Sequence, residues 1–289
     1  MSGLSPELRL PSSVVDKAVA EALAEDLGLG GDITTQATIA AGTRASGVIA
    51  ARKPGTIAGV QLARAAFKTL DPFAQFEVVV GDGGRVEAGG VIARISGDAR
   101  VLLTAERTAL NFLGHLSGIA TLTALYVAAV AGTKARIMDT RKTTPGLRAL
   151  EKFAVRCGGG VNHRFGLFDA VLIKDNHIVA AGGIGPALER ARAQSGHMMK
   201  VEIEVTNLDE IDEALQLDPD ALLLDNMDVS LLRAAVKEVA GRVVTEASGG
   251  INLNTVAAIA ATGVDLISVG ALTHSAPVLD IGFDFDPQT

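Results

Sequence analysis

The sequence predicts an α/β protein, an open and incomplete α/β barrel preceded by an N-terminal α+β domain. After residue 135, short apolar strands alternate with helical segments, which indicates a parallel sheet, either open and doubly wound or closed as a barrel. A polar residue stands at or near the C-terminal end of each strand, and in a barrel those ends converge on one mouth. Only six repeats are visible, two fewer than a complete barrel has. We therefore expect a gap that the N-terminal domain or a second subunit covers.

The first part of the chain lacks this regular alternation. An amphipathic pattern with a serine cap predicts a helix from Ser13 to Leu27. Strand-like runs follow, separated by glycine turns at 81–84 and 89–90: RASGVIAAR, FEVVVGD and GVIARI. We expect residues 1–116 to form the α+β domain, with the C-terminal tail 275–289 packing back on it.

A long apolar stretch joins the two parts. A helix opening at Thr104 is expected to break at Gly114 and Gly118, before a second helix ends near Val130. The stretch from 108 to 133 has no Lys, Arg, Asp or Glu, which would suit a membrane span. Its polar residues and glycines, with apolar positions that are mainly Ala and Leu, favour a buried helix, and we expect no membrane association.

The barrel domain is expected over residues 117–274. Its strands are RIMDT, AVLIKD, KVEIEV, ALLLDN, RVVTEAS and DLISVG. In KVEIEV, alternation puts Lys200, Glu202 and Glu204 on one face, which should look into the barrel because buried carboxylates need a partner or a metal. The polar residues at the strand ends are Asp139, Lys174, Glu204, Asp225, Glu246, Ser248 and Gly270.

Composition limits the classes of function. The single cysteine, Cys157, cannot form an internal disulfide or a cysteine-based metal cluster, which agrees with a reducing compartment. With no Trp and one Tyr, platforms of aromatic side chains for stacked bases are not expected. The N-terminus has no basic region followed by an apolar run, so we expect no signal peptide and a cytoplasmic protein.

Positive charge is concentrated in one segment. Residues 104–177 hold ten Lys or Arg against five Asp or Glu, which leaves −12 for the remainder of a chain of net charge −7. A nucleic acid or an anionic membrane would need a broad positive surface, so neither is expected as a partner. A pocket for a small polyanion fits the local charge better.

Two glycine motifs end the series of repeats, SGGI from Ser248 and VGALTHS from Val269. The last two loops of a barrel commonly hold a phosphate through backbone N–H groups, and glycine lets the backbone approach closely. Each motif alone is also explained by a tight turn. Together, after the last two strands, they predict a phosphate site.

A group of cations gathers in the middle of the chain: Arg141, Lys142, Arg164 and Lys174, with His163 beside them. Each one singly could form a surface ion pair. Lys174 ends a strand, as the Schiff-base lysine of an aldolase does, but its cationic neighbours favour an anion clamp.

The segment from Asp139 to His177, DTRKTTPGLRALEKFAVRCGGGVNHRFGLFDAVLIKDNH, is preceded by TAERTALNFLGHLSGIAT and followed by IEV, LLLDNM, EASGGI and VGALTHS. In this order the motifs resemble the quinolinate phosphoribosyltransferase family, from EDLGLGGDITT almost to the C-terminus. The resemblance implies a cytosolic enzyme of NAD synthesis that converts quinolinate and phosphoribosyl pyrophosphate into nicotinate mononucleotide, pyrophosphate and carbon dioxide. It also implies the type II phosphoribosyltransferase architecture and a homodimer with shared active sites. Further assembly into a hexamer is left open.

The resemblance carries roles to the matching positions. Arg141, His163, Arg164 and Lys174 would line the quinolinate pocket, which Arg107 would reach from the partner subunit. Thr140 would bind substrate, and Lys142, a catalytic residue, would contact phosphoribosyl pyrophosphate. Glu204 and Asp225 would be the catalytic carboxylates that face the ribose hydroxyls and hold Mg²⁺ through water. The loops for the 5′-phosphate would be Ser248, Gly249, Gly250, Val269, Gly270 and Ala271. Ala247 stands where many relatives have a serine, which matters little if backbone amides bind the phosphate.

The implied chemistry agrees with these residue types, because two carboxylates, a phosphate and a pyrophosphate need many cations in one mouth. Three alternatives remain: a relative associated with molybdenum transport that lacks part of the cation cluster, a class I aldolase that uses Lys174, and a metabolite-binding protein without catalysis.

Overall fold

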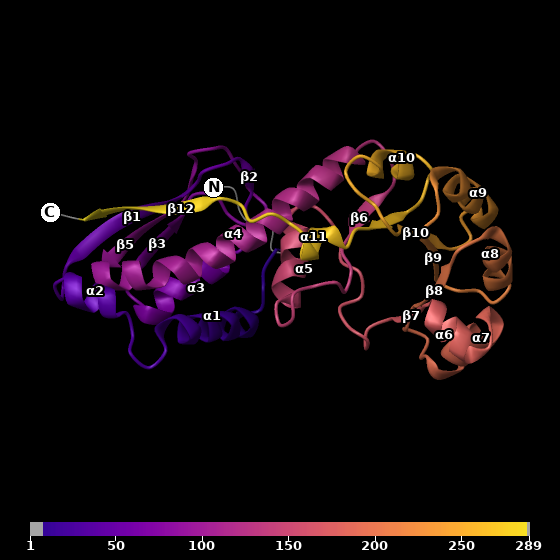
Figure 1. The fold of residues 1–289 in the computed structure, drawn as a ribbon, viewed down its shortest axis with the longest axis horizontal. Coiled ribbons are helices and arrows are strands. Elements are labelled where there is room, and N and C mark those ends of the chain that lie inside the picture. The colour runs from indigo at the N-terminus through magenta and orange to yellow at the C-terminus, as the bar shows by residue number, and fades with distance from the viewer. Residues whose placement is uncertain (1–7, 288–289) are drawn as a thin grey trace. The chain divides into compact units, whose positions relative to one another are not determined.

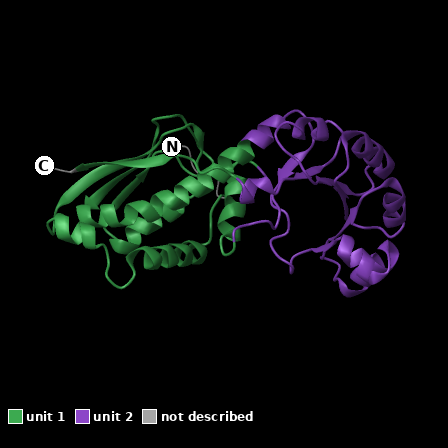
Figure 2. Cartoon of the chain, viewed as in Figure 1, with its two compact units in different colours: residues 1–124, 145–159, 276–289 green, residues 125–144, 160–275 purple. Residues whose placement is uncertain are grey.

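The computed structural model describes residues 8–287, in two compact units (Figure 2). Unit 1 comprises residues 1–124, 145–159 and 276–289, and unit 2 comprises 125–144 and 160–275. Residues 1–7 and 288–289, the ends of the expected N-terminal domain and of its tail, lie outside the described part. The expected boundary between residues 116 and 117 falls inside one helix, α4 (Ala99–Ala129).

Unit 1 is built on a four-stranded antiparallel sheet (Figure 1). Its strand order is β12 (Ile281–Pro287), β1 (Arg44–Ala51), β5 (Val91–Asp98), β3 (Gln75–Val78). The three strand-like runs of the sequence form β1, β3 and β5, and the C-terminal strand β12 pairs with β1. The other elements of the unit are α1 (Ser12–Leu27), α2 (Ile33–Thr38), β2 (Gly55–Thr56), α3 (Val60–Leu70), β4 (Arg85–Val86), most of α4, and α5 (Arg148–Cys157).

Helix α1 begins differently from its prediction. It buries Val15, Val19 and Leu23, which are four residues apart on one face. The expected serine cap is wrong, because the helix starts at Ser12 and its cap position is Pro11, whose side chain accepts no hydrogen bond. Helix α3 was not predicted, although its apolar face, with Leu62, Ala66 and Phe67, is buried in the core.

Helix α4 runs without a break through Gly114 and Gly118, where the sequence predicted one. These glycines let another part of unit 1 approach. A Cβ at Gly118 would collide with the Pro277 carbonyl oxygen, and Leu279 donates its N–H to the Gly114 carbonyl at 3.0 Å. Tertiary packing therefore explains glycines that local propensity counts as helix breakers.

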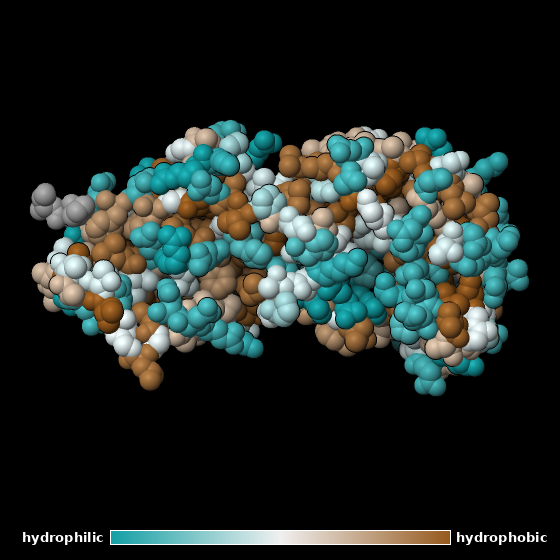
Figure 3. Space-filling model, viewed as in Figure 1, coloured by the Kyte–Doolittle hydropathy of each residue, from teal (hydrophilic) through white to brown (hydrophobic). Residues whose placement is uncertain are grey.

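By length and composition, α4 is the one described helix that could cross a membrane, but half of its most apolar window is buried inside the protein. Ser117 on α4 is fully buried and accepts the Ala58 N–H at 3.0 Å, as a core helix allows. On the face shown in Figure 3, hydrophilic and hydrophobic residues are interspersed over each unit.

Unit 2 holds a six-stranded parallel sheet in the order β6-β11-β10-β9-β8-β7. Its strands are β6 (Arg136–Met138), β7 (Val171–Ile173), β8 (Val201–Val205), β9 (Ala221–Asp225), β10 (Val244–Ser248) and β11 (Leu266–Ser268). Strands β6 and β7 are the two edges and do not pair with each other. The sheet is therefore an open α/β barrel, as the sequence predicted.

Five helices of unit 2 lie on the outside of the curved sheet (Figure 1): α6 (Asp175–Ala181), α7 (Ile184–Gln194), α8 (Leu208–Leu215), α9 (Val229–Val239) and α10 (Val256–Ala260). The short helix α11 (Ala271–His274) follows β11, and its two end residues line a cavity at the strand ends. On β8, Val201, Ile203 and Val205 are fully buried on one face, and Glu202 and Glu204 lie on the other. The carboxylates of Glu202 and Glu204 are therefore on the inner face of the sheet, as the alternation predicted.

Candidate active site

Two cavities lie at the carboxyl ends of the strands of unit 2. The first has a volume of about 290 Å³ and the second about 630 Å³, and both are lined by Thr140, Lys142, Lys174, Ser248 and Ser268. The first adds Arg141, His163, Arg164, Leu172, Leu223 and Glu246. The second adds Asp175, Glu204, Asp225, Asn226, Gly249, Gly250, Ile251, Val269, Gly270, Ala271 and His274. A larger cavity of about 870 Å³ in unit 1 contains none of the predicted site residues.

Two arginines of the first cavity hold buried donors that have no partner among residues 8–287. The Nε atoms of Arg141 and Arg164 are both buried and form no hydrogen bond within this described part of the chain, while Arg164 Nη1 donates to the Ala170 carbonyl at 3.0 Å. Burial, and then the charge of Arg141, lower the pKa of Arg164. Bringing two cations together away from water is costly unless an anion joins them. The first cavity is therefore suited to a ligand with carboxylates.

Lys174, Glu204 and Asp225 border the second cavity. Lys174 Nζ lies 3.4 Å from Glu204 Oε2, with the lysine side chain about half exposed and that of Glu204 buried. Burial raises the pKa of Glu204; Lys174 partly offsets this effect, and the charge of Asp225 adds to it. Asp225 accepts a 2.6 Å hydrogen bond from Asn226 Nδ2. Two carboxylates on adjacent strands supply the oxygen ligands that a hard cation such as Mg²⁺ prefers.

The SGGI loop, which lines the second cavity, has a backbone that only glycine adopts readily. Gly249 and Gly250 have φ of +96° and +64°, a region that favours glycine. A Cβ at Gly249 would also collide with the side chain of Asn226. The close approach of these two residues explains why a glycine stands there.

The second glycine loop is tied to the cation segment. Thr273 Oγ1 donates to the Lys142 carbonyl at 2.7 Å, and a Cβ at Gly270 would lie 3.1 Å from Lys142 Cδ. These contacts place the lysine beside the loop that follows β11. A phosphate held by that loop would lie within reach of a cation.

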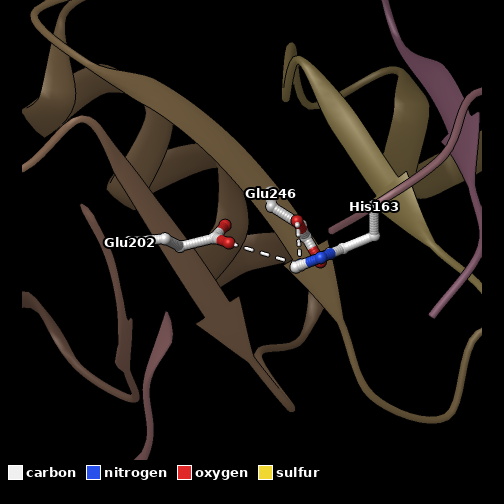
Figure 4. Close-up of side chains that lie close together, drawn as sticks. All are labelled: His163, Glu202 and Glu246. Carbon is white, nitrogen blue, oxygen red and sulfur yellow. Dashed lines mark ion pairs between the residues drawn. The ribbon is translucent and has the colours of Figure 1, made fainter. Parts of the chain in front are cut away.

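His163 joins the loop before β7 to two carboxylates of the sheet (Figure 4). Its Nε2 lies 3.3 Å from Glu202 Oε2 on β8 and 3.6 Å from Glu246 Oε2 on β10. Its Nδ1 accepts the Arg164 N–H at 2.7 Å. The proton of the neutral ring must therefore be on Nε2, facing the carboxylates.

The buried Asp139, which directly follows β6, holds the same loop by hydrogen bonds. It accepts hydrogen bonds from the His163 N–H at 2.9 Å and from Asn162 Nδ2 at 2.6 Å. This aspartate thus positions the backbone that carries His163 and Arg164.

Apart from Arg107, the predicted site residues all line one or both cavities. Arg107 lies on α4 in unit 1, with its side chain 64% exposed and an Nη2 atom 3.9 Å from Glu106. Sequence reasoning put Glu246 at a strand end of the mouth and Glu202 on the inward face but gave neither a role in the site, and it did not single out Ser268 or Asn226. Strand alternation could have indicated three of them. Glu202, Glu246 and Ser268 each stand two positions before a predicted site residue, and residues two apart in a strand lie on the same face. Asn226 directly follows Asp225.

Known proteins resemble the whole chain. Family profiles described as "Quinolinate phosphoribosyl transferase, N-terminal domain" and "C-terminal domain" match residues 32–117 and 119–284. A Mycobacterium leprae protein named nicotinate-nucleotide pyrophosphorylase [carboxylating] is 49% identical over 92% of this chain and 95% of its own. A Nicotiana glauca protein named quinolinate phosphoribosyltransferase [decarboxylating] 2, mitochondrial, is 43% identical over 92% of this chain and 81% of its own. The structure of the Francisella tularensis nicotinate-nucleotide pyrophosphorylase superposes with a TM-score of 0.93 at 41% identity, covering 98% of this chain and all of that one.

Proposed function

Because the chain belongs to the quinolinate phosphoribosyltransferase family, we propose that the two cavities of unit 2 are its active site. The enzyme is a pentosyltransferase of NAD biosynthesis. It converts quinolinate and 5-phosphoribosyl 1-pyrophosphate into nicotinate mononucleotide, pyrophosphate and carbon dioxide. The observation that carries the assignment of the site is the pair of buried, unpartnered guanidinium Nε atoms beside two glycine loops.

Quinolinate binds in the first cavity in this proposal. Its two carboxylates would take up the free donors of Arg141 and Arg164, and Lys174 would add a point charge at the border of the two cavities. His163 lines this pocket too, but its ring nitrogens already face Arg164 N–H and the carboxylates. We therefore propose that His163 positions Arg164 and does not bind the ligand directly.

Phosphoribosyl pyrophosphate binds in the second cavity. Backbone N–H groups of residues 248–250 and 269–271 would hold its 5′-phosphate, with Thr140 and Lys142 beside them. Glu204 and Asp225 would face the ribose hydroxyls. As the bond to pyrophosphate breaks, positive charge develops on the ribose, and the carboxylate of Glu204 would stabilise it.

Glu204 and Asp225 would also hold Mg²⁺, mostly through water, since they are two oxygen donors on neighbouring strands. Bound there, the ion would neutralise charge on the pyrophosphate leaving group. Decarboxylation follows transfer in this proposal, because the positive charge of the quaternised ring nitrogen can then stabilise the electron pair that the departing carbon dioxide leaves on the adjacent ring carbon. Release of carbon dioxide from quinolinate without phosphoribosyl pyrophosphate would contradict that order.

We also propose that the enzyme is a homodimer in which each active site uses residues of both subunits. Arg107, exposed on unit 1, would reach the quinolinate pocket of the partner. If Arg107→Ala and Lys142→Ala each abolish activity, mixing the refolded variants should restore about a quarter of the wild-type rate, as expected of a two-fold symmetric dimer with one intact site in half of its molecules. No recovery would place Arg107 outside the partner's site. We also propose a cytoplasmic location, and assembly beyond the dimer is open to measurement by sedimentation.

The decisive experiment measures carbon dioxide and nicotinate mononucleotide made by purified protein from quinolinate, phosphoribosyl pyrophosphate and Mg²⁺, beside Arg141→Ala. Equal amounts of both products, lost in the variant, would support the enzyme and its carboxylate clamp together. A folded protein without product would favour a relative with another ligand, or a binding protein without catalysis. Trapping of Lys174 by borohydride with a carbonyl substrate would instead indicate an aldolase.

A further inference from the structure

Glu246 is a buried carboxyl group to which the reaction described above gives no role. It stands in the middle of β10, flanked in register by Leu223 of β9 and Leu266 of β11. Its side chain is 2% exposed and yet lines the first cavity, beside Arg141 and Arg164. Its Oε1 atom is buried and has no hydrogen-bond partner among the residues that the structure describes.

The titratable groups that face Glu246 are few. Glu202 of β8 and His163 of the loop before β7 are the nearest, and Lys174 acts from a greater distance. The ligand atoms of Glu202, Glu246 and His163 lie within 4.8 Å of one another. Glu246 is buried and the Glu202 side chain is 14% exposed, and two carboxylates this close, largely removed from water, cannot both be ionised without a large penalty. Burial, and then the charge of Glu202, raise the pKa of Glu246 well above its ordinary value.

The hydrogen bond to His163 argues for a proton at this cluster instead of a metal ion. A metal on Nε2 would require the ring proton to sit on Nδ1. There it would meet the Arg164 N–H, which already donates to Nδ1 at 2.7 Å. The histidine therefore presents an N–H to the carboxylates, and that pairing suits one anionic and one neutral carboxyl group.

We propose that Glu246 is a neutral carboxylic acid in the wall of the first cavity, and that it donates the proton that replaces the carboxylate lost from the pyridine ring. This inference rests on the proposed function. The bond from the ring carbon to the carboxylate breaks, its electron pair stays on that carbon next to the quaternised nitrogen, and carbon dioxide leaves. The O–H bond of Glu246 then breaks and a C–H bond forms at the ring carbon. The carboxylate of Glu246 takes up one proton from the solvent before the next turnover, which is the proton that the overall reaction consumes.

The surroundings match this task. A carbanion on the ring is a strong base, so even a weak acid can protonate it, and a weak acid does not lose its proton to water beforehand. Glu202 and His163 act as positioning residues, because they hold a negative charge and an N–H donor against Glu246. The proton is thus kept at a wall of the cavity where water is largely excluded.

The test compares wild type with Glu246→Gln, which keeps size and neutrality but has no acidic proton, and with Glu246→Asp, which has one. Glu238→Gln, an exposed change on α9, is the matched control. Pyrophosphate, carbon dioxide and nicotinate mononucleotide are followed in a single turnover. The hydrogen isotope at the new C–H bond is measured in mixed H₂O and D₂O. Infrared difference spectra of the ligand-free proteins monitor the C=O band of a protonated carboxyl group.

We expect Glu246→Gln to release pyrophosphate, while formation of nicotinate mononucleotide slows by at least about tenfold relative to pyrophosphate release. The nucleotide that retains both carboxylates should accumulate, because a carbanion that is not protonated recombines with carbon dioxide in the cavity. The isotope ratio at the ring carbon should shift toward that of protonation by water, and the carboxylic-acid band should vanish. Glu246→Asp should restore part of the rate. An unchanged product ratio and isotope ratio, or wild-type protein without that band, would overturn the inference. Wild type that forms no pyrophosphate at all would instead overturn the proposed function.

Discussion

Replacement of Arg141 by methionine should separate binding of the ligand from stability of the fold. The Arg141 Nε donor is buried and unpartnered, and the charge of Arg141 lowers the pKa of the neighbouring Arg164. A buried donor left unsatisfied costs about 1–3 kcal/mol, which the ligand-free protein bears and a methionine of similar volume would not. The variant without ligand should therefore be no less stable than wild type.

The same substitution should weaken quinolinate binding. A hydrogen bond to a charged group is worth about 1.5–3 kcal/mol, so the Kd should rise by about 10-fold to 140-fold. At a quinolinate concentration of about 100 times the wild-type Kd, the ligand stabilises wild type by about 2.7 kcal/mol. For the variant this gain should fall to about 0.3–1.4 kcal/mol.

Denaturant unfolding with and without quinolinate gives both quantities. Arg192→Met is the control, since Arg192 on α7 pairs with Asp220 at 2.9 Å and lines neither active-site cavity. It should leave binding unchanged and cost about 0–1 kcal/mol of stability. An Arg141→Met protein that unfolds more easily without ligand, yet binds quinolinate as wild type does, would refute the assignment of Arg141 to the carboxylate clamp.

Three further outcomes are expected. Gly249→Ala should lose about 1–3 kcal/mol of stability from its positive φ, and more from its collision with Asn226; Gly241→Ala, with φ of +75° and open space around it, is the control for φ alone in thermal unfolding. Burial raises the pKa of Asp265, but hydrogen bonds from Lys134 and Thr245 outweigh this effect, so the pKa is lowered overall. The ionised Asp265 therefore stabilises the fold above the pKa of an ordinary carboxyl group, and this contribution is lost as the pH falls through the lowered pKa. Asp265→Asn should thus be less stable than wild type at neutral pH and equal to it in strong acid; a gap that stays constant with pH would contradict this. Chelation by EDTA should stop turnover until Mg²⁺ is restored, and Asp225→Asn should raise the Mg²⁺ concentration needed for half the maximal rate; full activity in EDTA would exclude the ion.

The barrel was predictable because its sequence signal is local. Each inward face alternates with an outward face that packs under a helix, as Val201, Ile203 and Val205 do on β8, and each strand ends in a polar residue. The predicted break in α4 failed for the opposite reason. Gly114 and Gly118 stand where they do because residues 277–279, far away in the sequence, pass against the helix. A single sequence shows the glycines but not the segment that requires them.

The same distinction divides the site. The residues predicted from strand ends and glycine loops form the outer row of the mouth, where polar side chains follow a strand and are conspicuous in the sequence. Glu246 was predicted at a strand end and Glu202 on an inward face, but each lies two residues before a predicted site residue, and alternation does not indicate the partner across the barrel. Their meeting with His163 depends on strands β8 and β10 and on a loop held by Asp139, which are brought together only by the fold. The mouth carries both signs of charge, since Lys142 and Lys174 stand there beside Glu204 and Asp225, whereas Glu202 and Glu246 are both acidic. The Glu246→Gln variant tests whether this acidic pair supplies a proton after the cations of the mouth have bound the substrate.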